Sequence, residues 1–218
     1  MKNSTIDIIN DFYDRYPHLK YLHNELIEVV EDIVTLAENG HKLLMCGNGG
    51  SCAECEHMAG ELNKGFKLKR PIPDDFSNTL KELFPEDHEK FAKNLQQAVT
   101  AIPLSTFVAS YTAFLNDCDP DIVYAQMLYA MAQPGDILLC LSTSGNSKNI
   151  IYPAKLAKAL GIKVVSFTGE TGGKLKEYSD LLFNVPGTKS YIVQENHLPL
   201  HHAICLAVEN ELFGEKDD

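Results

Sequence analysis

Residues 42–51 read KLLMCGNGGS, a short apolar run that passes directly into a glycine-rich loop. Residues 137–147 repeat this arrangement as ILLCLSTSGNS, with hydroxyl side chains around a single glycine. Continuous apolar runs of this length are typical of strands that are buried on both faces of a parallel sheet. A helical pattern follows each loop, so the sequence places both loops at strand–helix junctions.

The same alternation continues along the chain. Further strands are predicted at residues 98–106, 163–168 and 181–185, and helices at residues 52–66, 107–114, 122–132, 148–160 and 191–213. Pro199 must kink the last helix or mark its true start. Strands that alternate with helices predict an α/β fold with a doubly wound parallel sheet flanked by helices. Ligands of such sheets bind outside the carboxyl ends of the strands, where both loops are expected.

Two segments stand apart from this pattern. Residues 4–39 carry apolar side chains at helical spacing and predict one or two amphipathic helices that stop at Gly40. Residues 67–98 are charged and proline-containing, and they predict an excursion with one short helix near residues 86–97. We therefore divide the chain into an N-terminal helical segment, 1–39, and a main domain, 40–218, with an insertion near 74–97.

The overall charge narrows the possible partners. The 218 residues carry a formal net charge of −11, which argues against nucleic acid and anionic membrane surfaces. No run of about 18 apolar residues predicts a membrane helix. The N-terminus is too polar for a signal peptide, and the six cysteines are scattered. We expect a cytoplasmic protein.

Arg15 and Arg70 are the only arginines, so an anionic ligand must be bound largely by backbone N–H groups and hydroxyls. The glycines of GNGGS allow close approach of the backbone, and Ser51 is expected to cap the following helix. In STSGNS, four hydroxyl side chains and the helix N-terminus make a phosphate cradle that needs no formal charge. A tight turn and a serine-rich cap are the alternatives for the two loops.

A possible acid–base pair follows the first loop. His57 and Glu61 are spaced i, i+4 and share one helix face. Gln194 and His202 are eight residues apart, about 80° around a helix, and could line the same wall. Such nitrogen and oxygen donors suit zinc, but they could also act as acid and base without a metal. His57 and Glu61 are equally typical of a surface pair, and His197 and His201 share the i, i+4 spacing, so spacing does not choose among the histidines.

Several ordered motifs together resemble the sugar isomerase (SIS) domain, and more narrowly its phosphoheptose isomerase branch. They run from about residue 40 to the C-terminus, and are GNGGS with His57 and Glu61, Asn116-Asp117, STSGNS, Thr168-Gly169 with Gly172-Gly173, and Gln194-Glu195 with His202. The resemblance implies a homotetramer with an N-terminal helix between subunits. It also implies conversion of sedoheptulose 7-phosphate into D-glycero-D-manno-heptose 7-phosphate through an enediol(ate).

The resemblance also implies residue roles. The zinc ligands would be His57, Glu61, Gln194 and His202, with Glu61 as catalytic base and His202 as acid. The substrate-binding positions would be Asn48, Gly49, Gly50, Ser51, Glu61, Asn116, Asp117, Ser142, Thr143, Ser144, Ser147 and Gln194. The STSGNS loop would hold the phosphate, and GNGGS would lie closer to the reacting end.

Three departures leave the identity of the sugar open. An arginine usual shortly after the glutamate is replaced by the stretch Asn63-Lys64-Gly65-Phe66, the usual Arg-Ile-Gln reads Ile192-Val193-Gln194, and residues 74–97 are inserted. One alternative is an isomerase of another phosphosugar. Another is a non-catalytic SIS protein that binds sugar phosphates or a replication initiator; such relatives lack the glutamate and the final histidine, which are both present here. A third alternative is a regulatory domain that binds sugar phosphates. Such domains are normally fused to a DNA-binding domain, and the sequence shows no basic helical module of that kind.

Overall fold

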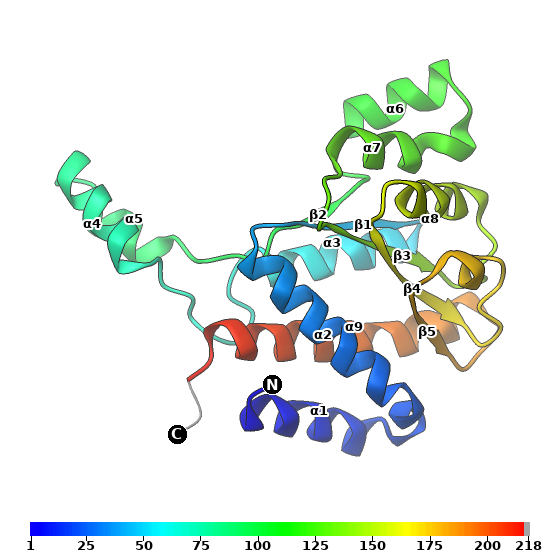
Figure 1. Cartoon of the computed structure of the whole chain (residues 1–218), viewed down its shortest axis with the longest axis horizontal. Coiled ribbons are helices and arrows are strands. Elements are labelled where there is room, and N and C mark those ends of the chain that lie inside the picture. The colour runs from blue at the N-terminus through cyan, green and yellow to red at the C-terminus, as the bar shows by residue number, and fades with distance from the viewer. Residues whose placement is uncertain (216–218) are drawn as a thin grey trace.

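The computed structural model describes residues 1–215, and its centre is a five-stranded sheet in which every pair of neighbouring strands is parallel. Residues 216–218, the end of the predicted main domain, lie outside the described residues. The strand order is β2 (Ala101–Pro103), β1 (Leu43–Gly47), β3 (Ile137–Ser142), β4 (Lys163–Gly169) and β5 (Leu181–Val185) (Figure 1). The predicted α/β fold with a parallel sheet is thereby confirmed.

Both faces of the sheet are buried. Leu43 and Met45 of β1 belong to one apolar cluster, whereas Leu44 and Cys46 belong to a second cluster on the opposite face. Successive side chains of a strand point to opposite faces, so a strand covered on both sides needs apolar residues at every position. This requirement explains the continuous apolar runs in the sequence.

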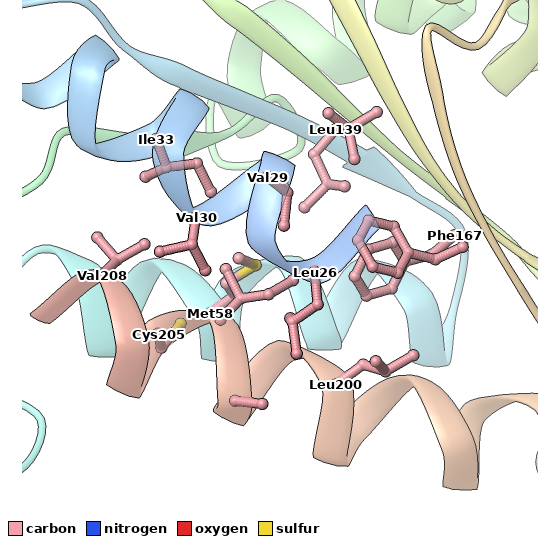
Figure 2. Packing of buried hydrophobic residues seen from close by; sticks show 14 of the residues in the cluster. Leu26, Val29, Val30, Ile33, Met58, Leu139, Phe167, Leu200, Cys205 and Val208 are labelled. Atoms are coloured by element: carbon pink, nitrogen blue, oxygen red, sulfur yellow. The ribbon is translucent and has the colours of Figure 1, made fainter. Parts of the chain in front are cut away.

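The first face is covered by α2 (His23–Glu38), α3 (Gly50–Leu62) and α9 (Ser190–Phe213). The short helix η1 (Pro17–Leu22) joins α2 to α1 (Asn3–Arg15), and α1 packs against α9. Side chains of α2, such as Leu26 and Val30, gather with Met58 of α3 and Cys205 of α9 (Figure 2). This packing fixes α3 and α9 relative to each other.

The opposite face is covered by α7 (Val123–Met131) and α8 (Lys148–Ala159), with the short helix η3 (Leu175–Tyr178) beside them. α6 (Val108–Asp117) has no buried residue and lies outside α7, to which η2 (Pro120–Ile122) connects it. Figure 1 shows α6 at the outer edge of this layer. No helix within residues 1–215 is long and apolar enough to cross a bilayer.

The region of residues 67–98 differs from its prediction. It contains two helices, α4 (Asp74–Leu83) and α5 (His88–Asn94), which pack on each other and project from the body (Figure 1). The sequence predicted only the second, because the apolar stripe of α4 is short and lies in a charged stretch between prolines; in the structure it buries a single residue, Leu80. The strand predicted at 98–106 forms only over the three residues of β2.

Pro199 does not mark the start of the last helix, because α9 is continuous from Ser190 through Pro199 to Phe213. A proline lacks the N–H that would bond the carbonyl four residues earlier, so the helix tolerates one missing backbone bond. The packing of α9 against α1, α2 and α3 outweighs that local loss.

The strand order 2-1-3-4-5 places a topological switch point between β1 and β3. Chain connections leave these adjacent strands toward opposite sides, which opens a crevice at their carboxyl ends. GNGGS follows β1 and STSGNS follows β3, so both loops lie at this crevice, as the sequence predicted.

Candidate active site

α9 lies alongside every part of the candidate site. At its first residue, Ser190, the hydroxyl accepts a 3.3 Å hydrogen bond from Thr143 in the STSGNS loop. Farther along α9, the Gln194 side chain lies so close to Gly50 that a Cβ at Gly50 would be 2.7 Å from its Nε2. Two turns later, His201 and His202 meet Glu61 of α3. The α9 helix therefore joins the two loops to the acid–base residues.

Glu61 is the centre of a compact cluster. Its Oε1 atom lies 3.1 Å from Nε2 of His57 and 3.3 Å from Nε2 of His202, and its Oε2 atom lies 3.3 Å from Nε2 of His201. The Glu61 side chain is 7% exposed, whereas the His57 side chain is 50% exposed. One donor atom from each of these four residues lies within 4.8 Å of the others. A buried carboxylate thus faces three imidazoles at a position that solvent can reach.

Two atoms of this cluster are buried without a hydrogen bond. They are Oε2 of Glu61 and Nε2 of His201, which face each other at 3.3 Å but lack hydrogen-bond geometry. Burying a polar group without a partner is unfavourable by roughly 1–3 kcal/mol, so such groups usually have a functional reason. The cluster therefore has unused binding capacity at its centre.

Glu54 sets the orientation of His201. Oε1 of Glu54 lies 3.4 Å from Nδ1 of His201, and both side chains are almost fully buried. When Nδ1 carries the proton and donates it to Glu54, the lone pair of Nε2 points toward Glu61. A carboxylate behind a histidine in this way is the usual arrangement around metal-ligating imidazoles.

The local electrostatics favour an ionised Glu61. Burial alone would raise its pKa, but the neighbouring imidazoles of His201 and His202 hold the pKa below its ordinary value. Burial lowers the pKa of His202, and repulsion by His201 and His57 outweighs the opposing pull of Glu61. Near neutral pH the cluster therefore offers a carboxylate base beside a neutral imidazole, which carries one N–H and one lone pair.

The donor set fits a divalent metal such as zinc. It combines imidazole nitrogens with carboxylate oxygen, and two of its atoms are buried and unpaired. His57, Glu61 and His202 belong to the predicted ligands and come together here. The fourth predicted ligand, Gln194, lies beside Gly50, and the described residues show no contact between it and these three.

The GNGGS loop is built for close backbone approach, but Ser51 does not cap the helix as predicted. α3 begins at Gly50, two residues earlier than expected, so Ser51 is inside the first turn and Gly49 takes the capping position without a side-chain bond. Gly49 has φ +55°, which a side chain rarely adopts. The Ser51 N–H donates to the Asn48 carbonyl at 3.1 Å, so only part of the first turn of α3 is available to a ligand.

The hydroxyls of STSGNS do not cap the helix that follows. Ser147 precedes α8 without a side-chain bond to the helix, and its hydroxyl lies 3.4 Å from that of Ser142. The Ser144 hydroxyl accepts a 3.1 Å bond from the Asn146 N–H within the loop. If this loop were only a serine-rich helix cap, more of these hydroxyls would bond to the N-terminus of α8. Their arrangement therefore favours an anion-binding loop.

The remaining predicted substrate positions lie at different distances from the loops. The side-chain amides of Asn48 and Asn149 exchange two 2.8 Å hydrogen bonds, which join GNGGS to α8 across the switch point. Asn116 and Asp117 end α6, are exposed, and share a 2.8 Å hydrogen bond. η2 and α7, which both pack on α6 and on α8, connect them to the site region.

Sequence reasoning missed Glu54 and left His201 among several histidines. Glu54, His57 and Glu61 are spaced i, i+3, i+7 on one face of α3, a signal that could have been used. The choice among histidines needed the structure: His197 instead faces the Thr168 carbonyl at 3.2 Å. Arg70 is fully buried and bound to Glu209, so it is not available to a ligand.

A family model described as the SIS domain matches residues 16–112 and 101–169. These matches span well over half of the chain and include both loops and the His57–Glu61 pair. The chain therefore belongs to the SIS domain family.

Individual relatives show which branch of the SIS domain family this chain resembles. A phosphoheptose isomerase of Akkermansia muciniphila is 31% identical over 201 residues, which cover 92% of this chain and 93% of the relative. One of Mycobacterium tuberculosis is 37% identical over 177 residues, covering 81% and 77%. A solved phosphoheptose isomerase structure from Francisella tularensis has a TM-score of 0.71 at 26% identity and covers 94% of this chain and 98% of that one. Within the SIS family, the chain groups with the phosphoheptose isomerases.

Proposed function

We propose that this protein is a ketose–aldose isomerase that converts sedoheptulose 7-phosphate into D-glycero-D-manno-heptose 7-phosphate through an enediol(ate). The observation that carries the proposal is the buried Glu61 carboxylate, ringed by His57, His201 and His202. Its curated relatives named phosphoheptose isomerase span most of the chain, which supports the choice of substrate.

In this mechanism Glu61 removes a proton from C1 of the ketose and returns it to C2. Its lowered pKa keeps the carboxylate ionised and ready to accept that proton. His202 moves protons between the oxygens on C1 and C2, using the N–H and the lone pair of its neutral imidazole. Glu54 holds His201 in place behind the base. Glu61 and His202 are thus the proposed catalytic residues.

The two loops hold the substrate between them. In STSGNS, Ser142, Thr143, Ser144 and Ser147 bind the phosphate with hydroxyls and backbone N–H groups. GNGGS, with Asn48, Gly49, Gly50 and Ser51, lies nearer the reacting carbons. Gln194, Asn116 and Asp117 complete the proposed set of substrate contacts.

Zinc is the proposed metal, held by donors of the cluster His57, Glu61, His201 and His202, with Gln194 as a further ligand implied by the resemblance. When bound, such an ion polarises a carbonyl or alkoxide oxygen and stabilises developing negative charge. We further propose a cytoplasmic homotetramer in which the N-terminal segment 1–39 packs between subunits.

Incubation of the purified protein with sedoheptulose 7-phosphate, with and without added zinc or a chelator, tests the function. We expect a new aldose phosphate signal in the NMR spectrum. Binding without any new aldose phosphate under either condition would favour a non-catalytic SIS protein. Turnover of another ketose phosphate alone would keep the reaction and replace the sugar.

A further inference from the structure

The projecting pair α4 and α5, here called the arm (residues 74–94), has an apolar surface that no other part of residues 1–215 covers. Phe76, Leu80, Leu83 and Phe84 follow the i, i+4, i+7, i+8 spacing of one helix stripe, yet Leu80 alone is buried. Leu83 and Phe84 are 65% and 52% exposed. Phe91 of α5 adds a further exposed ring.

The two helices of the arm are short and cover little of each other's apolar surface. Its helices have 10 and 7 residues, whereas isolated helices shorter than about 12–15 residues are marginal in water. An amphipathic helix is stabilised mainly by packing of its apolar face, and two short helices give each other little cover. A second surface against the stripe would therefore stabilise the arm.

The tip of the arm and the cavity at its base differ in charge, with Lys81 and Lys90 flanking the tip and Asp74 and Asp75 beginning α4 near the base. The tip, residues 82–89, carries Glu82, Glu86, Asp87 and Glu89 and no lysine or arginine. The base forms a cavity of about 470 Å³ lined by Lys67, Lys69 and Lys93 together with Leu68 and Leu95. None of these three lysine side chains forms an ion pair within residues 1–215. The acidic, apolar tip is thus complementary to the basic, partly apolar base.

We propose that the arms of two copies of this chain pack antiparallel, so that the tip of each arm enters the basal cavity of the other. This arrangement is two-fold symmetric, because the same tip and base meet twice. It buries Leu83 and Phe84 of both copies and joins four short helices into one bundle. A parallel arrangement would instead bring the two acidic tips together.

The basal cavity is attached to the candidate active site. Glu209 accepts hydrogen bonds of 2.8, 2.8 and 3.0 Å from the N–H groups of Phe66, Lys67 and Leu68, and it binds Arg70. Arg70 in turn donates to the carbonyl of Glu61 at 3.0 Å. The proposed interface therefore adjoins the segment that fixes the end of α3.

Cysteine cross-linking tests the arrangement in the full-length protein. One copy carries Leu83→Cys at the tip and the other Leu68→Cys at the base, both with the exposed Cys118 replaced by serine, and the two are co-produced with different tags. We expect mild oxidation to join tip to base between copies. A matched control pairs Leu83→Cys with a cysteine at exposed Lys155, which should cross-link at background level.

Charge reversal separates specific docking from chance collision. Adding Glu86→Lys and Asp87→Lys to the tip copy should lower the cross-link yield severalfold, and Lys67→Glu with Lys69→Glu on the base copy should restore it. A tip-to-base yield no higher than the Lys155 control overturns the proposal. A tip-to-tip product from Leu83→Cys alone contradicts the antiparallel arrangement. None of these outcomes depends on isomerase activity.

Discussion

Two buried carboxylates, Glu61 of α3 and Glu209 of α9, differ in how completely their oxygens are paired. Glu209 accepts three backbone N–H groups and a 2.8 Å bond from Arg70, and both members of that pair are about 1% exposed or less. Glu61 faces three imidazoles and keeps one oxygen without a hydrogen bond. A fully paired carboxylate stabilises the fold, whereas an incompletely paired one is available for chemistry.

Of the changes considered, removal of the Glu61 charge should have the largest effect, and that effect is on kcat. We expect Glu61→Gln to lower kcat by about 10²- to 10⁴-fold, the usual contribution of a general base, while sugar phosphate still binds. Steady-state kinetics together with calorimetric titration of sedoheptulose 7-phosphate measure both properties. Glu56→Gln, an exposed change on the same helix, is the matched control and should keep turnover. An unchanged kcat in Glu61→Gln would refute the proposed base.

Glu209→Gln should instead destabilise the fold, because it leaves the buried Arg70 without a counter-charge. Breaking a buried pair in this way typically lowers the free energy of unfolding by about 3–5 kcal/mol. Urea denaturation followed by circular dichroism measures the loss. Glu211→Gln is unsuitable as a control, because the half-buried Glu211 side chain accepts a hydrogen bond from the Lys2 N–H. Glu195→Gln is the better control on α9. A loss equal to that of the control would show that the pair contributes little.

Glu54→Gln tests whether the carboxylate behind His201 supports metal binding by the cluster around Glu61. Loss of the carboxylate behind His201 should weaken zinc binding by about 10- to 100-fold, as for other residues that support a ligating imidazole. Competition with a chromophoric chelator measures zinc affinity directly and does not require activity. Equal zinc affinity in Glu54→Gln and Glu56→Gln would remove Glu54 from the site.

The smallest expected effect is that of Glu209 on the pH dependence of stability. Burial alone would raise the pKa of Glu209, but the N–H groups of residues 66–68 and Arg70 hold it below its ordinary value. A carboxyl with a lowered folded pKa stabilises the fold above its unfolded pKa, and this contribution is lost as pH falls through the folded pKa. Urea midpoints at acidic pH should therefore fall more steeply in the wild type than in Glu209→Gln. Parallel curves would contradict this assignment.

The sequence predicted the sheet well because burial on both faces leaves a local signal. Residues 43–47 and 137–142 are apolar at nearly every position, and glycine marks the loop after β1. α4 has no continuous apolar run, because its few apolar residues follow one helix stripe within a charged stretch between prolines. Loops at the switch point could likewise be predicted, since they follow the strands directly.

The site could be predicted only in part. His57 and Glu61 lie on one helix, so their spacing was informative. The approach of His201 to Glu54 joins residues 147 positions apart and depends on how α9 packs beside α3. Neighbouring residues on α9 face different partners, and only the tertiary structure distinguishes His201 from His197.

Deuterium incorporation tests the central account most directly, because it follows the proton that Glu61 is proposed to move. Sedoheptulose 7-phosphate is incubated in D₂O with the wild type and with Glu61→Gln, and the recovered sugars are examined by NMR. We predict deuterium at C2 of the aldose phosphate and at C1 of the remaining ketose with the wild type, and none above background with Glu61→Gln. Incorporation by Glu61→Gln at the wild-type rate would contradict the claim that the incompletely paired carboxylate is the base.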